Sequence, residues 1–142
     1  MTLTKSEINT LLDAAQAARE NSYSPYSKFK VGAAVLTDDG KIFSGTNIEN
    51  SSYGLTVCAE RNAIFAAASA GYRKFKALAL ITQKLKGQKF NSPCGACRQV
   101  MSEFLAPDTP VYIAVFDGKK RTVYLKTFKE LMPFPFKKFT EK

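Results

Sequence analysis

The sequence predicts an α/β fold in which one β-sheet is covered by helices on both faces. Helix-like and strand-like hydrophobic patterns alternate along the chain in the order α-β-β-α-β-α-β-β-α. Interleaved elements of this kind favour a single sheet between helical layers. The chain has 142 residues, of which 45% are hydrophobic and 12% aromatic. That size and composition predict one domain spanning residues 1–142.

The first half of the chain is expected to contain one helix and a β-hairpin. A capping box of Thr4 and Glu7 predicts the helix start, and Pro25 lies beyond its end. Strands are expected at residues 29–36 and 41–46, because Asp-Asp-Gly between them is typical of a hairpin turn. The apolar face of the helix is expected at Ile8, Leu11, Leu12 and Ala15.

The second half is expected to alternate helix and strand. An alanine-rich pattern that ends at Gly71 predicts a helix buried on most sides. Thr127 and Glu130 form a second capping box, and the pairing across Asp117-Gly118 is left open. The expected elements are helices at 58–70 and 94–105, strands at 77–82, 111–116 and 121–125, and a short helix after Thr127.

Composition excludes several classes of function. The longest stretch without a charged residue, 62–72, is too short to span a bilayer, and the first residues lack the pattern of a signal peptide. We therefore expect a cytoplasmic protein. The absence of histidine excludes His-based catalysis or metal binding by this chain. Three cysteines without an export signal argue against a disulfide framework.

The net charge of +9 raises the question of an anionic partner. Residues 73–89 carry six basic residues and no acidic one. Such a surface can attract nucleic acid. We favour a lysine-rich surface with no nucleic-acid partner, because no stacking aromatic residues alternate with this basic block.

All three cysteines stand at the starts of expected helices. Cys58 precedes one helix, and Cys94 and Cys97 open another within a Pro-Cys-Gly-Ala-Cys segment. The Cys-x-x-Cys spacing lets two sulfurs converge on one ion, and helix N-termini lower thiol pKa values. Three thiolates without histidine suit zinc and leave its fourth position open for water, which is typical of a catalytic site.

Charged residues next to the cysteines complete this pattern. Glu60 lies two residues after Cys58, where a carboxylate can take a proton from a water at the metal and pass it to a leaving group. Three thiolates and Zn²⁺ sum to a net negative charge, so cations are expected nearby. We expect Arg61 first, and Arg98 second, to donate hydrogen bonds to the thiolates.

Three alternatives to a catalytic zinc site agree less well with the sequence. A Cys-x-x-Cys redox pair would need a thioredoxin-like setting, which the sequence does not show. A closed structural zinc site would need a fourth ligand, but there is no fourth cysteine and no histidine. Buried free cysteines would not account for Glu60 or for the two helix starts. Catalytic zinc is the favoured interpretation.

These motifs resemble the small, homotetrameric cytidine deaminases. The resemblance rests on Cys58-Ala59-Glu60-Arg61 and on Pro93-Cys94-Gly95-Ala96-Cys97-Arg98-Gln99, which match the zinc deaminase pattern. It extends to residues 25–34, similar to the family's first-strand motif, and to 47–50, similar to its nucleoside-binding loop. It implies a three-layer α-β-α sandwich with a central mixed five-stranded sheet. It also implies hydrolytic deamination of cytidine and 2′-deoxycytidine in pyrimidine salvage.

The resemblance also implies roles for individual residues. One Zn²⁺ per chain would be held by Cys58, Cys94 and Cys97, with Glu60 moving protons. Phe29 would pack against the pyrimidine, and Asn47 and Glu49 would hydrogen-bond the ribose 3′-hydroxyl. From the residues alone, Phe29 could equally be a core aromatic and Asn47 a turn residue.

Other implied roles involve a neighbouring subunit. The backbone of Ala59 would contact the base, and Tyr53 would lie near the ribose with a neighbour involved. Phe136 would enter a neighbour's site, although Phe134-Pro135 replaces the small residues usual before it. The resemblance thus implies a homotetramer with composite active sites.

Rival functions stay open at this point. One is a polynucleotide or tRNA deaminase, which the positive charge favours but Glu49 opposes, because a carboxylate repels a 3′-phosphodiester. Another is a zinc-stabilised nucleic-acid-binding module, which would need neither Glu60 nor an open zinc position. A third is an enzyme that acts on a modified base or nucleoside antibiotic.

Overall fold

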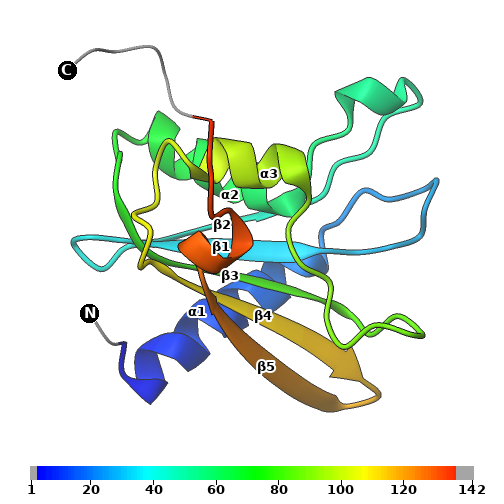
Figure 1. The fold of residues 1–142 in the computed structure, drawn as a ribbon. Helices are drawn as coiled ribbons and strands as arrows, with labels where there is room; N and C mark the ends of the chain where they lie inside the picture. Colours follow the sequence, from blue (N-terminus) through cyan, green and yellow to red (C-terminus); the bar gives the residue numbers. More distant parts are fainter. Residues whose placement is uncertain (1–2, 137–142) are drawn as a thin grey trace.

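A computed structural model describes residues 3–136, which form a sheet between two helical layers (Figure 1). Helix α1 (Lys5–Arg19) covers one face, and α2 (Ala59–Ser69) and α3 (Gly95–Met101) cover the other. A 3₁₀ turn, η1 (Tyr53–Leu55), and a short helix, α4 (Phe128–Leu131), complete the helical elements of this range. The strands are β1 (Gly32–Thr37), β2 (Ile42–Thr46), β3 (Phe75–Gln83), β4 (Pro110–Asp117) and β5 (Lys120–Thr127).

The sheet of residues 3–136 is mixed and five-stranded, in the order β2-β1-β3-β4-β5. β1 pairs antiparallel with β2 and β3, β3 pairs parallel with β4, and β4 pairs antiparallel with β5. The parallel pair needs a crossover, and α3 provides it. The predicted three-layer fold is confirmed, and the connection at Asp117-Gly118 is a hairpin.

Two apolar cores lie on the two faces of the sheet. Along β1, Ala33 and Val35 face the α2 side, whereas Ala34 and Leu36 face α1. All six residues of β1 are buried, because helices cover this strand on both sides. The expected apolar face of the first helix is confirmed at Leu11, Leu12 and Ala15, which are fully buried or nearly so.

Some element boundaries differ from those predicted. The first strand begins at Gly32 rather than at residue 29, because the backbone just before Gly32 pairs with the Asn47 side chain instead of with a neighbouring strand. Asn47 accepts a hydrogen bond from the Val31 amide at 3.0 Å and donates to the Phe29 carbonyl at 2.7 Å. The third helix ends at Met101 rather than at 105, and the Ser102 hydroxyl donates to the Gln99 carbonyl there at 2.6 Å.

Glycine lets α2 lie directly on β2. A Cβ added to Gly45 would lie 2.4 Å from the backbone nitrogen of Ala63 and 2.9 Å from the carbonyl oxygen of Ala59. No real side chain tolerates such contacts, so only glycine permits this approach. The contact fixes the height of the first turn of α2 above the sheet, and this turn carries Cys58 and Glu60.

Capping boxes start two helices, as predicted. In α1, Thr4 accepts from the Glu7 amide and Glu7 accepts from the Thr4 amide. In α4, Thr127 and Glu130 make the same reciprocal pair. Among the described residues, the helices are too short or too polar to cross a bilayer.

Candidate active site

The starts of α2 and α3 bring the three cysteines together. Cys58 is the N-cap of α2, Cys94 is the N-cap of α3, and Cys97 lies in the first turn of α3. Their sulfur atoms all lie within 4.8 Å of one another. Cys58 and Cys94 are 36 residues apart in the sequence. They meet in the fold because β3 runs from the end of α2 back toward the start of α3.

The sulfur geometry fits zinc. The distance from the Cys58 sulfur to the Cys94 sulfur is 3.8 Å, and that from Cys94 to Cys97 is 3.5 Å. Sulfurs that coordinate one tetrahedral zinc ion at about 2.3 Å lie about 3.8 Å apart. A set of three thiols with no histidine nearby is a donor set that suits Zn²⁺ and leaves one position open.

Arg61 supplies the expected positive charge. Its guanidinium donates to the Cys58 sulfur at 3.5 Å. A hydrogen bond from Cys97, together with Arg61, lowers the pKa of Cys58 to about 5, against partial burial. The same hydrogen bond between the two thiols raises the pKa of Cys97. The hydrogen bond to Cys58 also raises the pKa of Arg61, so this side chain stays charged beside the sulfurs.

Arg98 departs from the sequence-based expectation. Its guanidinium donates to the carbonyl oxygens of Pro93 at 2.7 Å and Leu131 at 2.5 Å, and to the Ser92 hydroxyl at 2.7 Å. No hydrogen bond joins it to a sulfur within residues 3–136. Because its side chain turns back past the helix start, Arg98 anchors the segment before Cys94 to α4.

Glu60 is the buried acid of the site. Only 5% of its surface is exposed, and no side-chain cation pairs with it among the described residues. Burial, together with the charge on Cys58, raises the pKa of Glu60 to about 7, although a backbone hydrogen bond and the charge on Arg61 oppose the shift. A carboxyl with a pKa near neutrality can both accept and donate protons.

A pocket of about 290 Å³ opens over the cysteines and Glu60. Phe29, Asn47 and Glu49 line it, as do two of the three cysteines. The rest of the wall comes from residues to which the sequence pattern assigns no individual role. That wall consists of Ser27, Val31, Thr56, Leu80, Thr82, Asn91 and Ser92. For Thr82 a signal existed, since it lies at the end of a buried strand where ligands of open sheets bind.

Asn47 and Glu49 have defined orientations beside this pocket. Oδ1 of Asn47 accepts hydrogen bonds from the Ser22 hydroxyl and from the Val31 amide. Its Nδ2 donates to the Phe29 carbonyl, which leaves one amide hydrogen. Glu49 accepts from the Tyr26 and Ser27 amides and from the Ser27 hydroxyl, and this hydroxyl contributes most to its lowered pKa.

The other residues that were expected to bind substrate do not line this pocket. Ala59 is fully buried at the first position of α2. Tyr53 is 77% exposed and lines a second pocket that shares Ser27, Glu49 and Thr56 with the first. Phe136 is 62% exposed, does not line the pocket of its own chain, and accepts a hydrogen bond on its carbonyl from Gln99.

Comparison with known proteins places this geometry in a family. The model of the cytidine and deoxycytidylate deaminase zinc-binding region matches residues 5–113, a range that includes every cysteine and Glu60. The chain belongs to this family. Membership confirms the resemblance to the cytidine deaminases, and the family's zinc-binding description agrees with the clustered thiols.

Relatives extend the match beyond the zinc region. Cytidine deaminase from Sporosarcina psychrophila is 47% identical over 132 residues, which is 93% of each chain. Cytidine deaminase from Halalkalibacterium halodurans is 47% identical over 126 residues, covering 89% of this chain and 91% of the relative. The crystal structure of cytidine deaminase from Burkholderia pseudomallei superposes with a TM-score of 0.82 at 46% identity, covering 94% and 100%.

Proposed function

We propose that this chain hydrolyses cytidine and 2′-deoxycytidine to uridine and 2′-deoxyuridine with release of ammonia, a reaction of pyrimidine salvage. The observation that carries the proposal is the buried Glu60 carboxyl at the wall of a pocket where three thiols converge. Membership of the deaminase family and the curated cytidine deaminases at 47% identity support it.

The residues at the metal end divide the chemistry between them. Zinc held by Cys58, Cys94 and Cys97 would supply Lewis acidity there, which lowers the pKa of water. Glu60 takes a proton from the attacking water and delivers it to N3 of cytosine, which makes C4 electrophilic, and the water oxygen adds to C4. Glu60 then takes the proton of the new C4 hydroxyl and delivers it to the amino group, so that the C4–N bond breaks, the oxygen stays on C4 as a carbonyl and ammonia leaves. The raised pKa of this carboxyl suits both steps.

The residues at the other end of the pocket select a nucleoside. The remaining amide hydrogen of Asn47 donates to the ribose 3′-hydroxyl, and the charged Glu49 accepts from it. Phe29 packs against the pyrimidine, and the Ala59 backbone contacts the base. Asn47 is therefore both a turn residue and a ligand in this proposal, because its side chain has hydrogen-bonding capacity for both.

Isotopic labelling tests the reaction directly. Incubation with cytidine in ¹⁸O-labelled water should give uridine with one labelled oxygen at C4 and one ammonia per uridine, as measured by mass spectrometry and an ammonia assay. Uridine without the label, or ammonia without uridine, would overturn hydrolysis at C4.

Glu49 distinguishes a nucleoside deaminase from a polynucleotide deaminase. We propose that cytidine is turned over and that cytidine 3′-monophosphate is not, because the Glu49 carboxylate repels a 3′-phosphate. A Glu49→Gln variant should narrow the difference in kcat/KM between the two compounds. Equal kcat/KM values for both compounds in the unmodified protein would favour the polynucleotide alternative.

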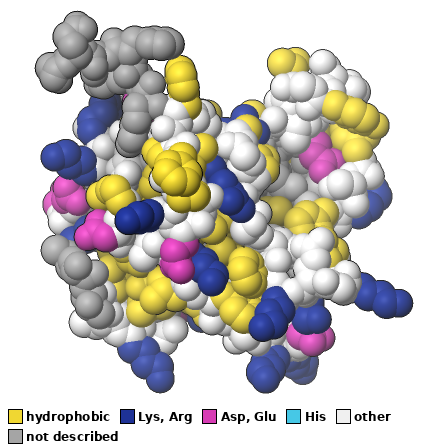
Figure 2. Space-filling view, in the orientation of Figure 1, with side chains coloured by type: hydrophobic (Ala, Val, Ile, Leu, Met, Phe, Trp, Pro, Cys, Tyr) yellow, Lys and Arg dark blue, Asp and Glu magenta, His cyan; other side chains and the backbone are white. Residues whose placement is uncertain are grey.

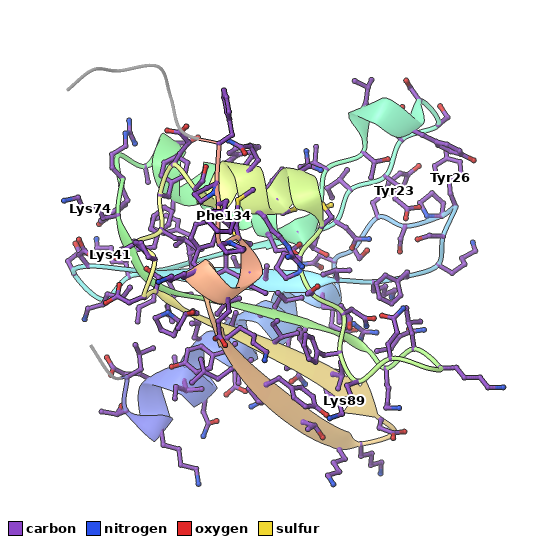
Figure 3. The ribbon with its side chains drawn as sticks, in the orientation of Figure 1. Tyr23, Tyr26, Lys41, Lys74, Lys89 and Phe134 are labelled. Atoms are coloured by element: carbon purple, nitrogen blue, oxygen red, sulfur yellow. The ribbon has the colours of Figure 1, made fainter. Side chains whose placement is uncertain are left out.

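Assembly into a homotetramer with composite active sites is part of the proposal. The loops beside the pocket present exposed apolar side chains, and Figure 2 shows such side chains gathered at the upper right. Tyr23 and Tyr26 project from this loop cluster in Figure 3. Phe136 would enter a neighbour's site, and Tyr53 would lie near the ribose with a neighbouring subunit involved. The exposed residues of the cluster are Tyr23, Tyr26, Ile48, Tyr53 and Leu55.

Subunit mixing tests the composite site. Glu60→Gln and Phe136→Ala variants are each expected to have little activity, and a mixture of refolded chains should recover part of it. Recovery requires that one chain lends Phe136 to the Glu60 of another. A monomer by light scattering, or a mixture no more active than its components, would contradict this arrangement.

The cellular setting and the domain organisation complete the proposal. Three free thiols that serve as metal ligands suit a reducing compartment, and we infer a cytoplasmic protein on this ground.

We also infer a single domain over residues 1–142, since one sheet joins all the strands between residues 3 and 136.

A further inference from the structure

One residue beside the pocket has an unusual backbone conformation. Lys28 has a φ of 61°, and every other residue with a positive φ between residues 3 and 136 is a glycine. The left-handed region is unfavourable for a residue with a Cβ, so a lysine adopts it only where its surroundings impose it. Such outliers cluster at active sites and ligand clamps. The Lys28 side chain is exposed and does not itself line the pocket.

The two neighbours of Lys28 both belong to the pocket wall. They are Ser27 and Phe29. The Ser27 hydroxyl accepts a hydrogen bond from the Phe29 amide at 3.0 Å, which closes a tight turn across Lys28. The Lys28 amide donates to the Ser24 carbonyl at 3.0 Å. These two hydrogen bonds hold Lys28 in its left-handed conformation.

Each of these neighbours is also bonded to a residue that is proposed to bind the ribose. The hydroxyl and the amide of Ser27 donate to the Glu49 carboxylate, as does the Tyr26 amide at 3.0 Å. On the other side of the turn, Nδ2 of Asn47 donates to the Phe29 carbonyl at 2.7 Å. The turn between Ser27 and Phe29 therefore connects the contacts of Glu49 to those of Asn47.

We propose that Lys28 is a positioning residue, whose left-handed backbone sets Glu49 and Asn47 at the spacing that the ribose 3′-hydroxyl requires. This inference rests on the proposed function, which gives both side chains a hydrogen bond to that hydroxyl. One side chain must accept and the other must donate at the same oxygen atom. Because hydrogen bonds weaken steeply with poor alignment, a shift of the turn weakens this pair of contacts.

The contacts of Glu49 leave it little freedom to compensate for such a shift. Its Oε1 accepts from the amides of Tyr26 and Ser27, and its Oε2 accepts from the Ser27 hydroxyl. A carboxylate has about four acceptor sites, so about one remains on Oε2 for a substrate. The direction of that remaining site is set by the turn that holds the carboxylate.

The charge of Lys28 is a minor influence on this carboxylate. The hydrogen bond from the Ser27 hydroxyl contributes most to the lowered pKa of Glu49, and the charge on Lys28 is the smallest of the causes. The role that we assign to Lys28 therefore belongs to its backbone conformation, and a variant can separate the two.

The test compares cytidine with 3′-deoxycytidine as substrates of a Lys28→Val variant. Valine disfavours the left-handed region strongly, because its side chain is branched at Cβ. We expect kcat/KM for cytidine to fall about tenfold through KM, the effect of one hydrogen bond, with kcat and zinc content nearly unchanged. For 3′-deoxycytidine, kcat/KM should change little. A displaced Phe29 would affect both substrates alike, so the ratio of their kcat/KM values isolates the contacts with the 3′-hydroxyl.

Three further variants complete the design. Lys28→Asn removes the charge but tolerates the left-handed conformation, so it should keep the ratio. Lys30→Val makes the same change as Lys28→Val at an exposed lysine whose φ is not positive, and it should also keep the ratio. Ser27→Ala removes the hydroxyl that joins the Phe29 amide to Glu49, and it should lower the ratio. Ser27→Ala keeps the inference testable if Lys28→Val does not fold.

The outcomes separate this inference from the proposed function. An unchanged ratio in Lys28→Val, or an equal fall in Lys28→Asn, would overturn the positioning role of the backbone. Equal kcat/KM values for the two substrates in the unmodified protein would also overturn it, because no recognition of the 3′-hydroxyl would remain. No turnover of cytidine by the unmodified, zinc-loaded protein would overturn the proposed function, and this inference with it. A lower ratio in Lys28→Val alone among the three lysine variants would support the inference.

Discussion

Glu60 and Arg61 are neighbours in the first turn of α2, yet they face different partners. The Glu60 side chain is buried at the pocket, and its pKa is raised because burial disfavours the carboxylate. The Arg61 guanidinium contacts the Cys58 sulfur. Successive residues of a helix point about 100° apart, so one turn can serve the proton transfer and the charge balance of the metal at once.

Replacing Glu60 tests its role as the proton carrier. Glu60→Gln keeps the shape of the side chain but cannot take up a proton. It should retain zinc and lose about 10²–10⁴-fold or more in kcat, the usual contribution of general acid–base catalysis. Zinc content by metal analysis and kcat by absorbance check both parts, with Glu103→Gln on the surface as control. Near-normal turnover by Glu60→Gln would remove Glu60 from the mechanism.

The two arginines should separate in their effects. Arg61→Gln removes the donor to the Cys58 sulfur, and we expect a loss of about 10–100-fold in activity or zinc affinity. Arg98→Gln removes donors to three oxygens that hold the segment before Cys94, and it should lower the melting temperature more than Arg61→Gln does. Measurement of Tm, kcat and zinc content in both variants decides this. A larger loss of melting temperature in Arg61→Gln, together with a larger loss of activity or zinc in Arg98→Gln, would contradict the assigned contacts.

At the scale of elements, the site depends on how closely α2 packs on β2. The two helix starts are brought together because α2 and α3 lie on the same face of the sheet, over a shared core. Gly45 allows the α2 backbone to approach, and β3 and β4 carry the crossover that returns the chain through α3. The cysteine cluster is therefore a consequence of packing as well as of local sequence.

A methyl group at Gly45 should disturb this packing. Gly45→Ala would place a Cβ against the backbone of α2, and we expect a loss of about 1–3 kcal/mol in the free energy of unfolding. Urea titration measures the loss. Gly54→Ala is the matched control, because nothing lies within 4 Å of a Cβ there and its φ is not positive. Equal stability of the two variants would show that α2 can shift at little cost.

Local signals predicted most of the elements, whereas contacts between distant residues escaped prediction. The capping boxes at Thr4 and Thr127 and the hairpin turn at Asp38-Asp39-Gly40 depend on neighbouring residues, and all three are confirmed. The late start of β1 depends on the Asn47 side chain, which comes from beyond the hairpin. Arg98 contacts Leu131, which lies 33 residues away in the sequence, and no local pattern predicts such a partner.

The same contrast between local signals and long-range contacts holds for the residues of the candidate active site. The spacing of Cys58, Cys94 and Cys97 predicted that the sulfurs would meet, because cysteine is a specific metal ligand. Asn91 and Thr82 escaped notice, since Asn and Thr are common in loops and strands. Their position on the wall depends on how the segment between β3 and α3 folds back on β3.

At the scale of the whole molecule, positive charge is spread over both ends of the sheet. Lys41 and Lys74 lie at one end and Lys89 at the other (Figure 3). The two ion pairs within residues 3–136 join Arg19 to Glu20 and Arg121 to Asp13, so no lysine takes part in them. The labelled lysines are therefore distributed over the two ends of the sheet rather than gathered at one of them.

The dispersed charge predicts how the reaction responds to salt. A nucleoside is uncharged, so its encounter with the pocket gains nothing from the net charge of +9. We expect kcat/KM for cytidine to change by less than about twofold between about 0.05 and 0.5 M NaCl, although the Debye length falls severalfold. A steep decrease with salt would instead indicate an anionic substrate, as for polynucleotide binding.

The proposed zinc-dependent deamination of cytidine rests on three convergent thiols and a buried carboxyl. Its most direct test is the ultraviolet spectrum of cytidine mixed with purified protein of known zinc content, before and after prolonged chelation and after zinc is restored. We expect conversion to the uridine spectrum with about one zinc per chain, loss of conversion without zinc, and recovery on zinc addition. No conversion by the zinc-loaded protein, or full activity in protein shown to be free of zinc, would contradict it.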